Sequence, residues 1–202
     1  SKVYSLKHYQ ADSAATPLIE TGQFPRKIVT DVVPPMILYR GYPKTQDITT
    51  DYRLPAGAPV MSYVEPKPTL QWQVKPEKRE ILGHSCQRAE VSFGGRQWIA
   101  WFTSEIPLSE GPYKFGGLPG LILEVADSEG DYRYTCIGIA NLSAGENIVR
   151  WKWNQRPTTR KELEKIIVQL YANPEQAIKA LGGRMGFKGD PMLNLPYNPI
   201  EK

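Results

Sequence analysis

The clearest pattern of apolar and polar positions lies between residues 86 and 103, where two alternating runs flank the dipeptide Gly94-Gly95. A dipeptide of this type between two alternating runs predicts a β-hairpin with a two-residue turn. When Phe93 is placed opposite Arg96, one face of the hairpin receives mostly apolar pairs: Val91 with Trp98, Ala89 with Ala100, and Gln87 with Phe102. This face is predicted to be part of the core.

The opposite face of the hairpin carries Ile99 and Trp101 on its second strand and polar residues on its first. Large apolar side chains that lie side by side on a sheet are more often covered than left in water. We therefore expect a helix, a loop or a ligand to cover this face. Ile99 and Trp101 are the first candidate binding residues.

Shorter apolar runs predict the remaining strands. They lie at 60–65, 69–74 and 80–82, at 121–126 and 132–139 around a turn at 127–130, and at 148–153. Two β-branched runs between residues 24 and 39 are broken by Pro34-Pro35 and predict edge or bent strands. Residues 1–20 show no period, and the segment 41–59, rich in proline and glycine, predicts a loop or a lid.

Near the C-terminus the period changes to that of a helix with one apolar face. The apolar positions at this spacing are Leu163, Ile166, Ile167, Leu170 and Tyr171. Thr158 or Thr159 is predicted to cap the helix, and Glu162 can complete a capping box with Thr159. A second, short helix is predicted to begin at Asn173-Pro174 and to end at Gly182-Gly183.

These elements predict a mainly β (α+β) protein that forms a single domain over residues 1–202. The 18 proline and 17 glycine residues favour short strands and turns over long helices. Strands followed by one late helical pair predict a curved antiparallel sheet or half-barrel, with the helices packed on one face. The tail 186–202 is expected to be extended and to wrap the sheet.

Charge and hydropathy narrow the classes of partner. The formal net charge is +4, without a run of five basic residues, so no nucleic-acid partner is predicted. No stretch approaches the roughly 18 uninterrupted apolar residues of a spanning helix, so no transmembrane segment is predicted. Because the sequence opens at Ser1 without a methionine, we expect that a preceding segment, which could carry a targeting signal, has been removed.

The sequence offers few groups for catalysis or metal binding. His84 and Cys86 are two residues apart, but two ligands are too few for a closed zinc site, and His8 is the only other histidine. No metal, cofactor or nucleophilic site is therefore predicted. Glu105 and Glu124 bracket a glycine-rich loop, and a glycosidase would need two such carboxyl groups about 5–9 Å apart in a cleft.

The glycine-rich loop itself runs from Gly111 into the strand at 121–126. Pro119 followed by Gly120 predicts a type II turn, so the four residues Gly117, Leu118, Pro119 and Gly120 are interpreted as a rigid structural corner. Glycines on this path also allow the backbone to lie close against another surface. Tyr113 and Lys114 are expected to be exposed at the tip, where they and Glu105 could contact a ligand.

The same region resembles a known family. The string GLPGLIL at 117–123 is similar to the signature that names the GLPGLI family. Further matches to the family pattern lie at 83–89 (GHSCQRA), 101–107 (WFTSEIP), 111–115 (GPYKF) and 197–201 (YNPIE). The resemblance is good over about residues 60–140 and weaker outside them.

The resemblance implies an exported protein of a Gram-negative bacterium, made with a signal sequence and placed in the periplasm or at the outer membrane. The family has no established biochemical function, so no catalytic residues are carried over. Cys86 and Cys136 permit one disulfide without requiring it. Related sequences often have an aliphatic residue at the position of Cys136, which argues against a disulfide shared by the family.

The leading functional expectation is a non-enzymatic binding or accessory protein of the cell envelope. Its partner would be a hydrophobic or peptide ligand, or a periplasmic or outer-membrane protein. One alternative is an envelope hydrolase that uses Glu105 and Glu124. The other is a protein–protein adaptor whose contact surface is the proline-rich segment 34–68.

Overall fold

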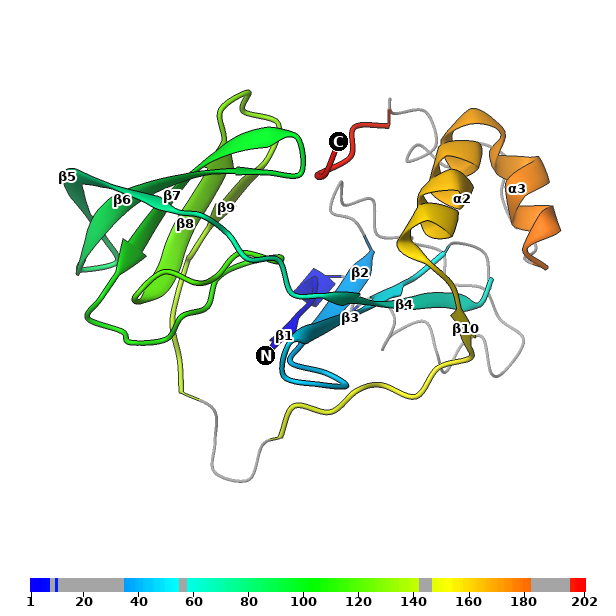
Figure 1. The fold of residues 1–202 in the computed structure, drawn as a ribbon. Coiled ribbons are helices and arrows are strands. Elements are labelled where there is room, and N and C mark those ends of the chain that lie inside the picture. Colours follow the sequence, from blue (N-terminus) through cyan, green and yellow to red (C-terminus); the bar gives the residue numbers. More distant parts are fainter. Residues whose placement is uncertain (8–9, 11–34, 55–57, 142–146, 183–196) are drawn as a thin grey trace. The chain divides into compact units, whose positions relative to one another are not determined.

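Short strands dominate the fold (Figure 1). The computed structural model describes residues 1–7, 10, 35–54, 58–141, 147–182 and 197–202. Within them the chain divides into two compact units. The first unit contains residues 1–66 and 148–197, and the second contains residues 67–147 and 198–202.

The sheet of the first unit has five strands in the order β1-β2-β3-β4-β10. Its strands are β1 (Lys2–Val3), β2 (Met36–Arg40), β3 (Asp47–Tyr52), β4 (Val60–Pro66) and β10 (Gln155–Pro157). Neighbouring strands are antiparallel except β10, which runs parallel to β4. The predicted strand at 60–65 is confirmed as β4, whereas the β-branched residues 24–33 lie outside the described residues.

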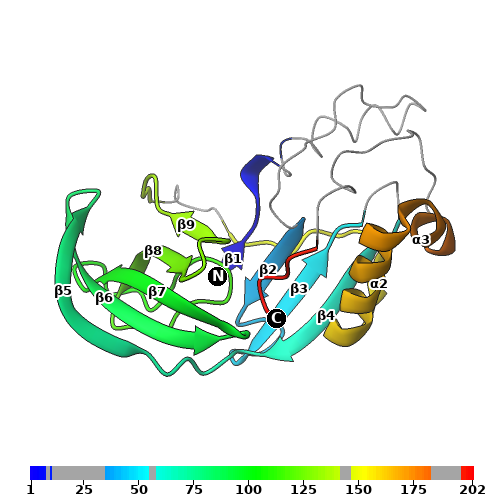
Figure 2. The same ribbon diagram turned by 90° about the horizontal axis from the view of Figure 1, so that it is seen from above.

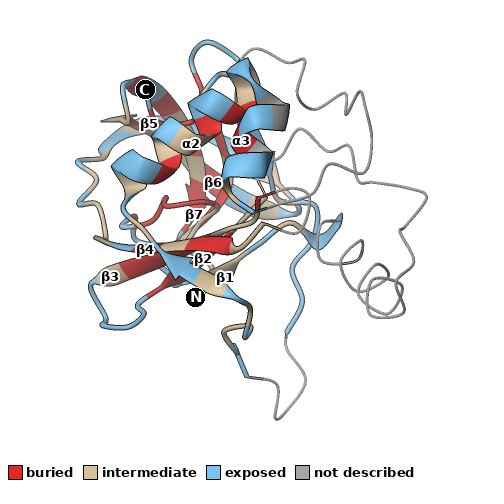
Figure 3. Ribbon diagram, turned by 90° about the vertical axis from the view of Figure 1, so that its right-hand side faces the viewer, coloured by how far each residue is buried: buried red, intermediate tan, exposed pale blue. Residues whose placement is uncertain are grey.

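Two helices follow β10, as the helical period predicted. Helix α2 (Arg160–Ala172) has the expected capping box between Thr159 and Glu162, and α3 (Pro174–Ala180) follows it. One side of α2 is buried (red in Figure 3), and Figure 2 shows the helix beside β4. The buried cluster is formed by Leu54, Met61, Tyr63, Leu163, Ile167, Leu170 and Ala177. The amphipathic helix is therefore held by the sheet of the first unit. No described helix has both the length and the apolar composition needed to cross a membrane.

The prediction of a loop or lid over 41–59 was wrong for its centre, because β3 lies there and pairs with both β2 and β4. This strand is polar, yet Thr49, Thr50 and Asp51 are at most 1% exposed. Arg150 satisfies the Asp51 carboxylate with two hydrogen bonds of 2.6 and 3.0 Å. The prediction of a strand at 148–153 was also wrong, because these residues are irregular. Arg150 in this segment supplies the ion pair with Asp51.

The sheet of the second unit follows the chain order β5-β6-β7-β8-β9 and is antiparallel throughout. Its strands are β5 (Gln73–Ile81), β6 (His84–Phe93), β7 (Arg96–Thr103), β8 (Leu121–Asp127) and β9 (Arg133–Thr135). The two pieces predicted at 69–74 and 80–82 correspond to the single strand β5. The strand predicted at 132–139 is formed only over β9.

The register of the β6–β7 hairpin is confirmed pair by pair, from Phe93 opposite Arg96 to Gln87 opposite Phe102. Gly94 and Gly95 have φ angles of 58° and 72°, as the two-residue turn requires. The face predicted to be core is buried, and Trp98 at its centre is 1% exposed. The mainly β fold with C-terminal helices is thus confirmed, with the strands distributed over two sheets rather than one curved sheet.

Candidate functional site

The outer face of the second unit's sheet contains a hollow of about 360 Å³. Strand register places Trp101 between Arg88 and Glu124 across three strands, and places Ile99 between Glu90 and Ala126. Both Ile99 and Trp101 line the hollow, in agreement with the prediction that they share one face of the hairpin. Each is half-buried, in contrast to the sealed positions on the other face of the same strands.

The cover over Trp101 comes from the edge strand β5, which is separated from β7 by β6. The guanidinium of Arg79 in β5 lies 4.2 Å from the Trp101 ring centroid, a cation–π contact. Arg79 is held there by a 2.8 Å ion pair with Glu124, which also binds Arg133 at 3.1 Å. Helix α2, one of the covers considered from the sequence, packs against β4 instead.

The charged groups that line the hollow are balanced, with three guanidinium groups and three carboxylates. Three guanidinium groups line it, those of Arg79, Arg88 and Arg133, together with the carboxylates of Glu77 and Glu124. A sixth charged group in the lining, Asp127, is buried and paired with Arg96 at 2.6 Å. The side chain of Arg133 is 66% exposed, so its guanidinium is accessible from solvent.

The two carboxylates considered for hydrolysis have separate partners. Glu124 lies between two arginines in the hollow, whereas Glu105 does not line it. Glu105 accepts hydrogen bonds from His84 Nδ1 at 2.7 Å and from the Ser85 backbone N–H at 3.1 Å. Both bonds lower the pKa of the Glu105 carboxyl group, and the bond with His84 contributes the most. A general acid needs a raised pKa, so this environment is opposite to the one that hydrolysis requires.

The expectation that Tyr113 and Lys114 are exposed was wrong. Tyr113 is 6% exposed and Lys114 is 2% exposed. The ammonium of Lys114 forms a 2.5 Å ion pair with Glu201, and the Tyr113 hydroxyl donates a hydrogen bond to the same carboxylate oxygen. The sequence could not show this contact, because the partner lies 87 residues away from Lys114.

The C-terminal residues also lie against the hairpin turn. The backbone N–H of Lys202 donates to the Gly94 carbonyl at 2.7 Å. A Cβ atom at Gly94 would lie 2.7 Å from Cγ of Glu201, and one at Gly95 would lie 2.9 Å from Cβ of Lys202. The two glycines therefore serve both the turn and the close approach of the tail.

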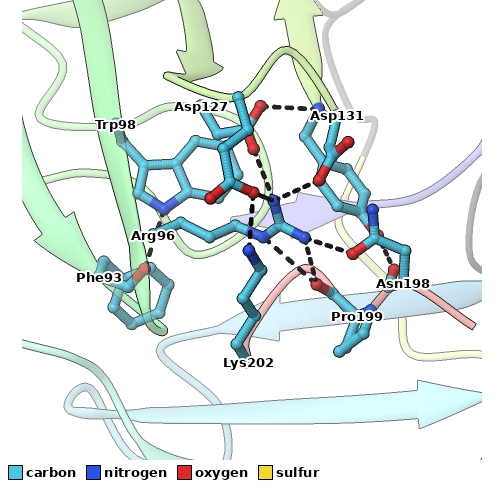
Figure 4. A network of polar contacts seen from close by, with 10 residues as sticks. Phe93, Arg96, Trp98, Asp127, Asp131, Asn198, Pro199 and Lys202 are labelled. Carbon is cyan, nitrogen blue, oxygen red and sulfur yellow. Dashed lines mark hydrogen bonds and ion pairs between the residues drawn. The ribbon is translucent and has the colours of Figure 1, made fainter.

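A buried arginine, Arg96, connects the tail with the wall of the hollow (Figure 4). Its side chain is 1% exposed and donates to Asp127 and Asp131 at 2.6 and 2.7 Å. Towards the tail it donates to the Asn198 side chain at 2.6 Å and to the Pro199 carbonyl at 3.0 Å. Sequence analysis did not single out Arg96, although its position next to the glycine turn is visible in the sequence.

The acidic residues around Arg96 have the grouping of a cation site. Oxygen atoms of Asp127, Glu129 and Asp131 lie within 4.8 Å of one another. The guanidinium of Arg96 donates to all three, with the contact to Glu129 at 3.3 Å. The protein's own cation therefore occupies the position that a metal ion would take.

At the structural corner Gly117–Gly120 the predicted turn type is not formed, whereas the predicted close approach of the backbone to another surface is present. Gly120 has a φ of 158°, whereas a type II turn needs about +80° at this position, so the predicted turn type was wrong. A Cβ atom at Gly120 would lie 2.0 Å from the carbonyl oxygen of Thr103. This glycine is required because two backbone segments pass too close for any side chain.

The two cysteines are free thiols, with Cys86 buried and Cys136 half-buried. Burial raises the pKa of the Cys86 thiol, which keeps it protonated and unreactive. Mild alkylation of the native protein should therefore modify Cys136 alone, and alkylation after unfolding should modify both. Mass spectrometry of alkylated peptides measures this, and a Cys86–Cys136 disulfide in the native protein would contradict it.

Fold and site together define a mainly β protein with a hollow lined by arginine and tryptophan on one sheet and a C-terminal segment docked on the same unit. Residues 94–124 match the model of a family described as "Protein of unknown function (Porph_ging)". This is the GLPGLI-type family. The matched range begins at the glycine turn, includes Tyr113 and Lys114, and ends at Glu124.

The sequence and the structure were also compared with curated proteins and with solved structures. No curated protein matches the sequence. Two similar solved structures are described as PNGF-II in the P21 and C2 space groups, with TM-scores of 0.47 and 0.46. Each is 14% identical, and the match covers 69% of this chain. The chain spans about a quarter of their length, with 26% of each covered.

Proposed function

We propose that this is a non-enzymatic binding protein whose hollow around Trp101 takes an extended peptide or protein segment with an acidic and an apolar side chain. The observation that carries the proposal is the aromatic floor of Trp101 beneath the Arg79 guanidinium, in a hollow that also presents the exposed guanidinium of Arg133. Ile99 extends the apolar part of this floor.

The chemistry of the hollow fits such a ligand. Arg79 and Arg133 share one carboxylate, that of Glu124, so a ligand carboxylate can bind either guanidinium without leaving a buried charge unpaired. Trp101 and Ile99 offer an apolar surface on the central strand β7, which pairs with β6 on one side and with β8 on the other. A site on a paired strand is pre-organised, and this reduces the entropy lost on binding.

We also propose that the protein acts in the cell envelope, in the periplasm or at the outer membrane. Support comes from the GLPGLI-type motif, since the resemblance implies exported proteins. Fractionation of the source cells with an antibody to this chain tests the location. Recovery with cytoplasmic markers would refute it.

Replacing Trp101 with alanine should weaken peptide binding about thirtyfold, because a central aromatic residue typically carries a large share of binding energy. Two sets of fluorescent heptapeptides can serve as probes, one composed of glutamate, leucine and phenylalanine and the other with lysine in place of glutamate. Fluorescence anisotropy should show binding of the acidic set and little binding of the basic set.

Trp153 provides a matched control in the first unit, because Arg53 lies 5.2 Å from its ring centroid in a similar stack. The Trp153→Ala variant should bind the acidic peptides like the wild type. Equal weakening by both tryptophan variants, equal binding of both peptide sets, or no binding at all would each refute the proposed role of the hollow.

A further inference from the structure

The charged side chains around the hollow form separate sets of ion pairs, and the balance of charge differs from one set to the next. On the side of β5 and β6, Arg88 pairs with Glu77 at 2.9 Å and with Glu90 at 2.5 Å. Lys75 lies 3.5 Å from Glu90. Two cations meet two carboxylates here, so this set is neutral and has no need of a charged ligand.

The set on the side of β8 and β9 contains two cations and one carboxylate. Oε1 of Glu124 lies 2.8 Å from Nη2 of Arg79 and 3.1 Å from Nη1 of Arg133. Within the described part of the chain, neither guanidinium has another carboxylate partner. The two like charges repel each other across the single oxygen that they share. A second carboxylate at this place would neutralise the set.

Of the two arginines, Arg133 is the one available to a ligand. Arg79 lies over the ring of Trp101 as well as against Glu124, and its side chain is 38% exposed. The side chain of Arg133 is 66% exposed, and it contacts Glu124 through Nη1 at the longer distance. The other donors of the Arg133 guanidinium can therefore form the two parallel hydrogen bonds that a carboxylate accepts from arginine.

An apolar floor leads from the centre of the sheet to Arg133. Strands β8 and β9 lie side by side (Figure 1), with Arg133 opposite Ala126, and Ala126 is in turn opposite Ile99 on β7. Residues directly opposite each other on neighbouring strands share a face of the sheet. All three residues line the hollow, and Ala126 is the smallest of them. A ligand side chain that rests on Ala126 would have Ile99 on one side and the Arg133 guanidinium on the other.

We propose that Arg133 is the specificity-determining residue of the hollow. Its guanidinium binds the carboxylate of a ligand aspartate or glutamate, and this carboxylate becomes the second acid of the set around Glu124. A neighbouring apolar side chain of the ligand rests on Ala126 and Ile99, while Arg79 stays over Trp101 as a fixed wall. This inference rests on the peptide-binding function proposed above and names the residue that selects the acidic group.

The test compares the acidic heptapeptides described above with a set in which glutamine replaces glutamate. Fluorescence anisotropy of the wild type should show a preference of about tenfold or more for the acidic set, because hydrogen bonds between charged groups are stronger than neutral ones. The Arg133→Gln variant should bind both sets about equally. Arg160→Gln is the matched control, since it removes one positive charge from a side chain in the first unit that is 36% exposed. This variant should keep the full preference.

Charge reversal provides a gain of binding that a misfolded variant could not show. The Arg133→Glu variant should bind the lysine-containing set more tightly than the acidic set. If Arg133→Gln kept the preference of the wild type, or if Arg133→Glu gained no affinity for the lysine-containing set, Arg133 would not select the ligand. The proposed function would survive either result, because the wild type would still bind acidic peptides. Failure of the wild type to bind any peptide would overturn both.

Discussion

Replacing Lys114 with methionine, or Glu201 with glutamine, is expected to lower the free energy of unfolding by about 3–5 kcal/mol. Each change leaves one buried charge without its partner, because both side chains are at most 6% exposed and lie 2.5 Å apart. Urea denaturation of the wild type and the two variants measures the difference. The cost arises from the unpaired charge, so the double variant should be less destabilised than the sum of the single ones.

The matched control is Lys202→Ala, which removes the neighbouring ion pair with Glu129. The side chains of this pair are 42% and 55% exposed, so its loss should cost no more than about 1 kcal/mol. If Lys114→Met and Lys202→Ala proved equally mild, the tail would not be docked as the structure shows.

Replacing Gly120 with alanine is expected to cost about 3 kcal/mol or more, since a Cβ atom there would lie 2.0 Å from the Thr103 carbonyl oxygen. Backbone atoms form both sides of this contact, so no side-chain rotation can relieve it. The melting temperature of the variant, with circular dichroism to verify the β content, measures the effect.

Gly117 in the same motif is the control for Gly120. It has a φ of 89°, but the nearest atom to an added Cβ would be Trp72 Nε1 at 4.0 Å. Gly117→Ala should therefore cost only the strain of a left-handed backbone, about 1–2 kcal/mol. A larger loss at Gly117 than at Gly120 would contradict the close approach of the two backbone segments.

Part of the candidate site could be read from the sequence and part could not. Alternation alone placed Ile99 and Trp101 on one face, because side chains two residues apart in a strand share a face whatever surrounds them. Arg79 could not be identified as the residue that covers Trp101, since its contact depends on strand pairing between β5 and β6 and on Glu124 from β8. Tyr113 and Lys114 were placed at an exposed tip for the same reason: their buried partner, Glu201, is remote in the sequence.

The sequence by itself determined the local structure of this protein: the hairpin around Gly94-Gly95 with its register, and helix α2 with its Thr159–Glu162 cap. These features depend on periodicity and on residues a few positions apart. Only the tertiary structure decided that polar residues 47–52 form a buried strand, that the strands belong to two sheets, and that Glu201 lies against Lys114. Each of these depends on pairing a polar or charged group with a distant partner, and the free energy of such a pair is set by burial, which local sequence does not encode.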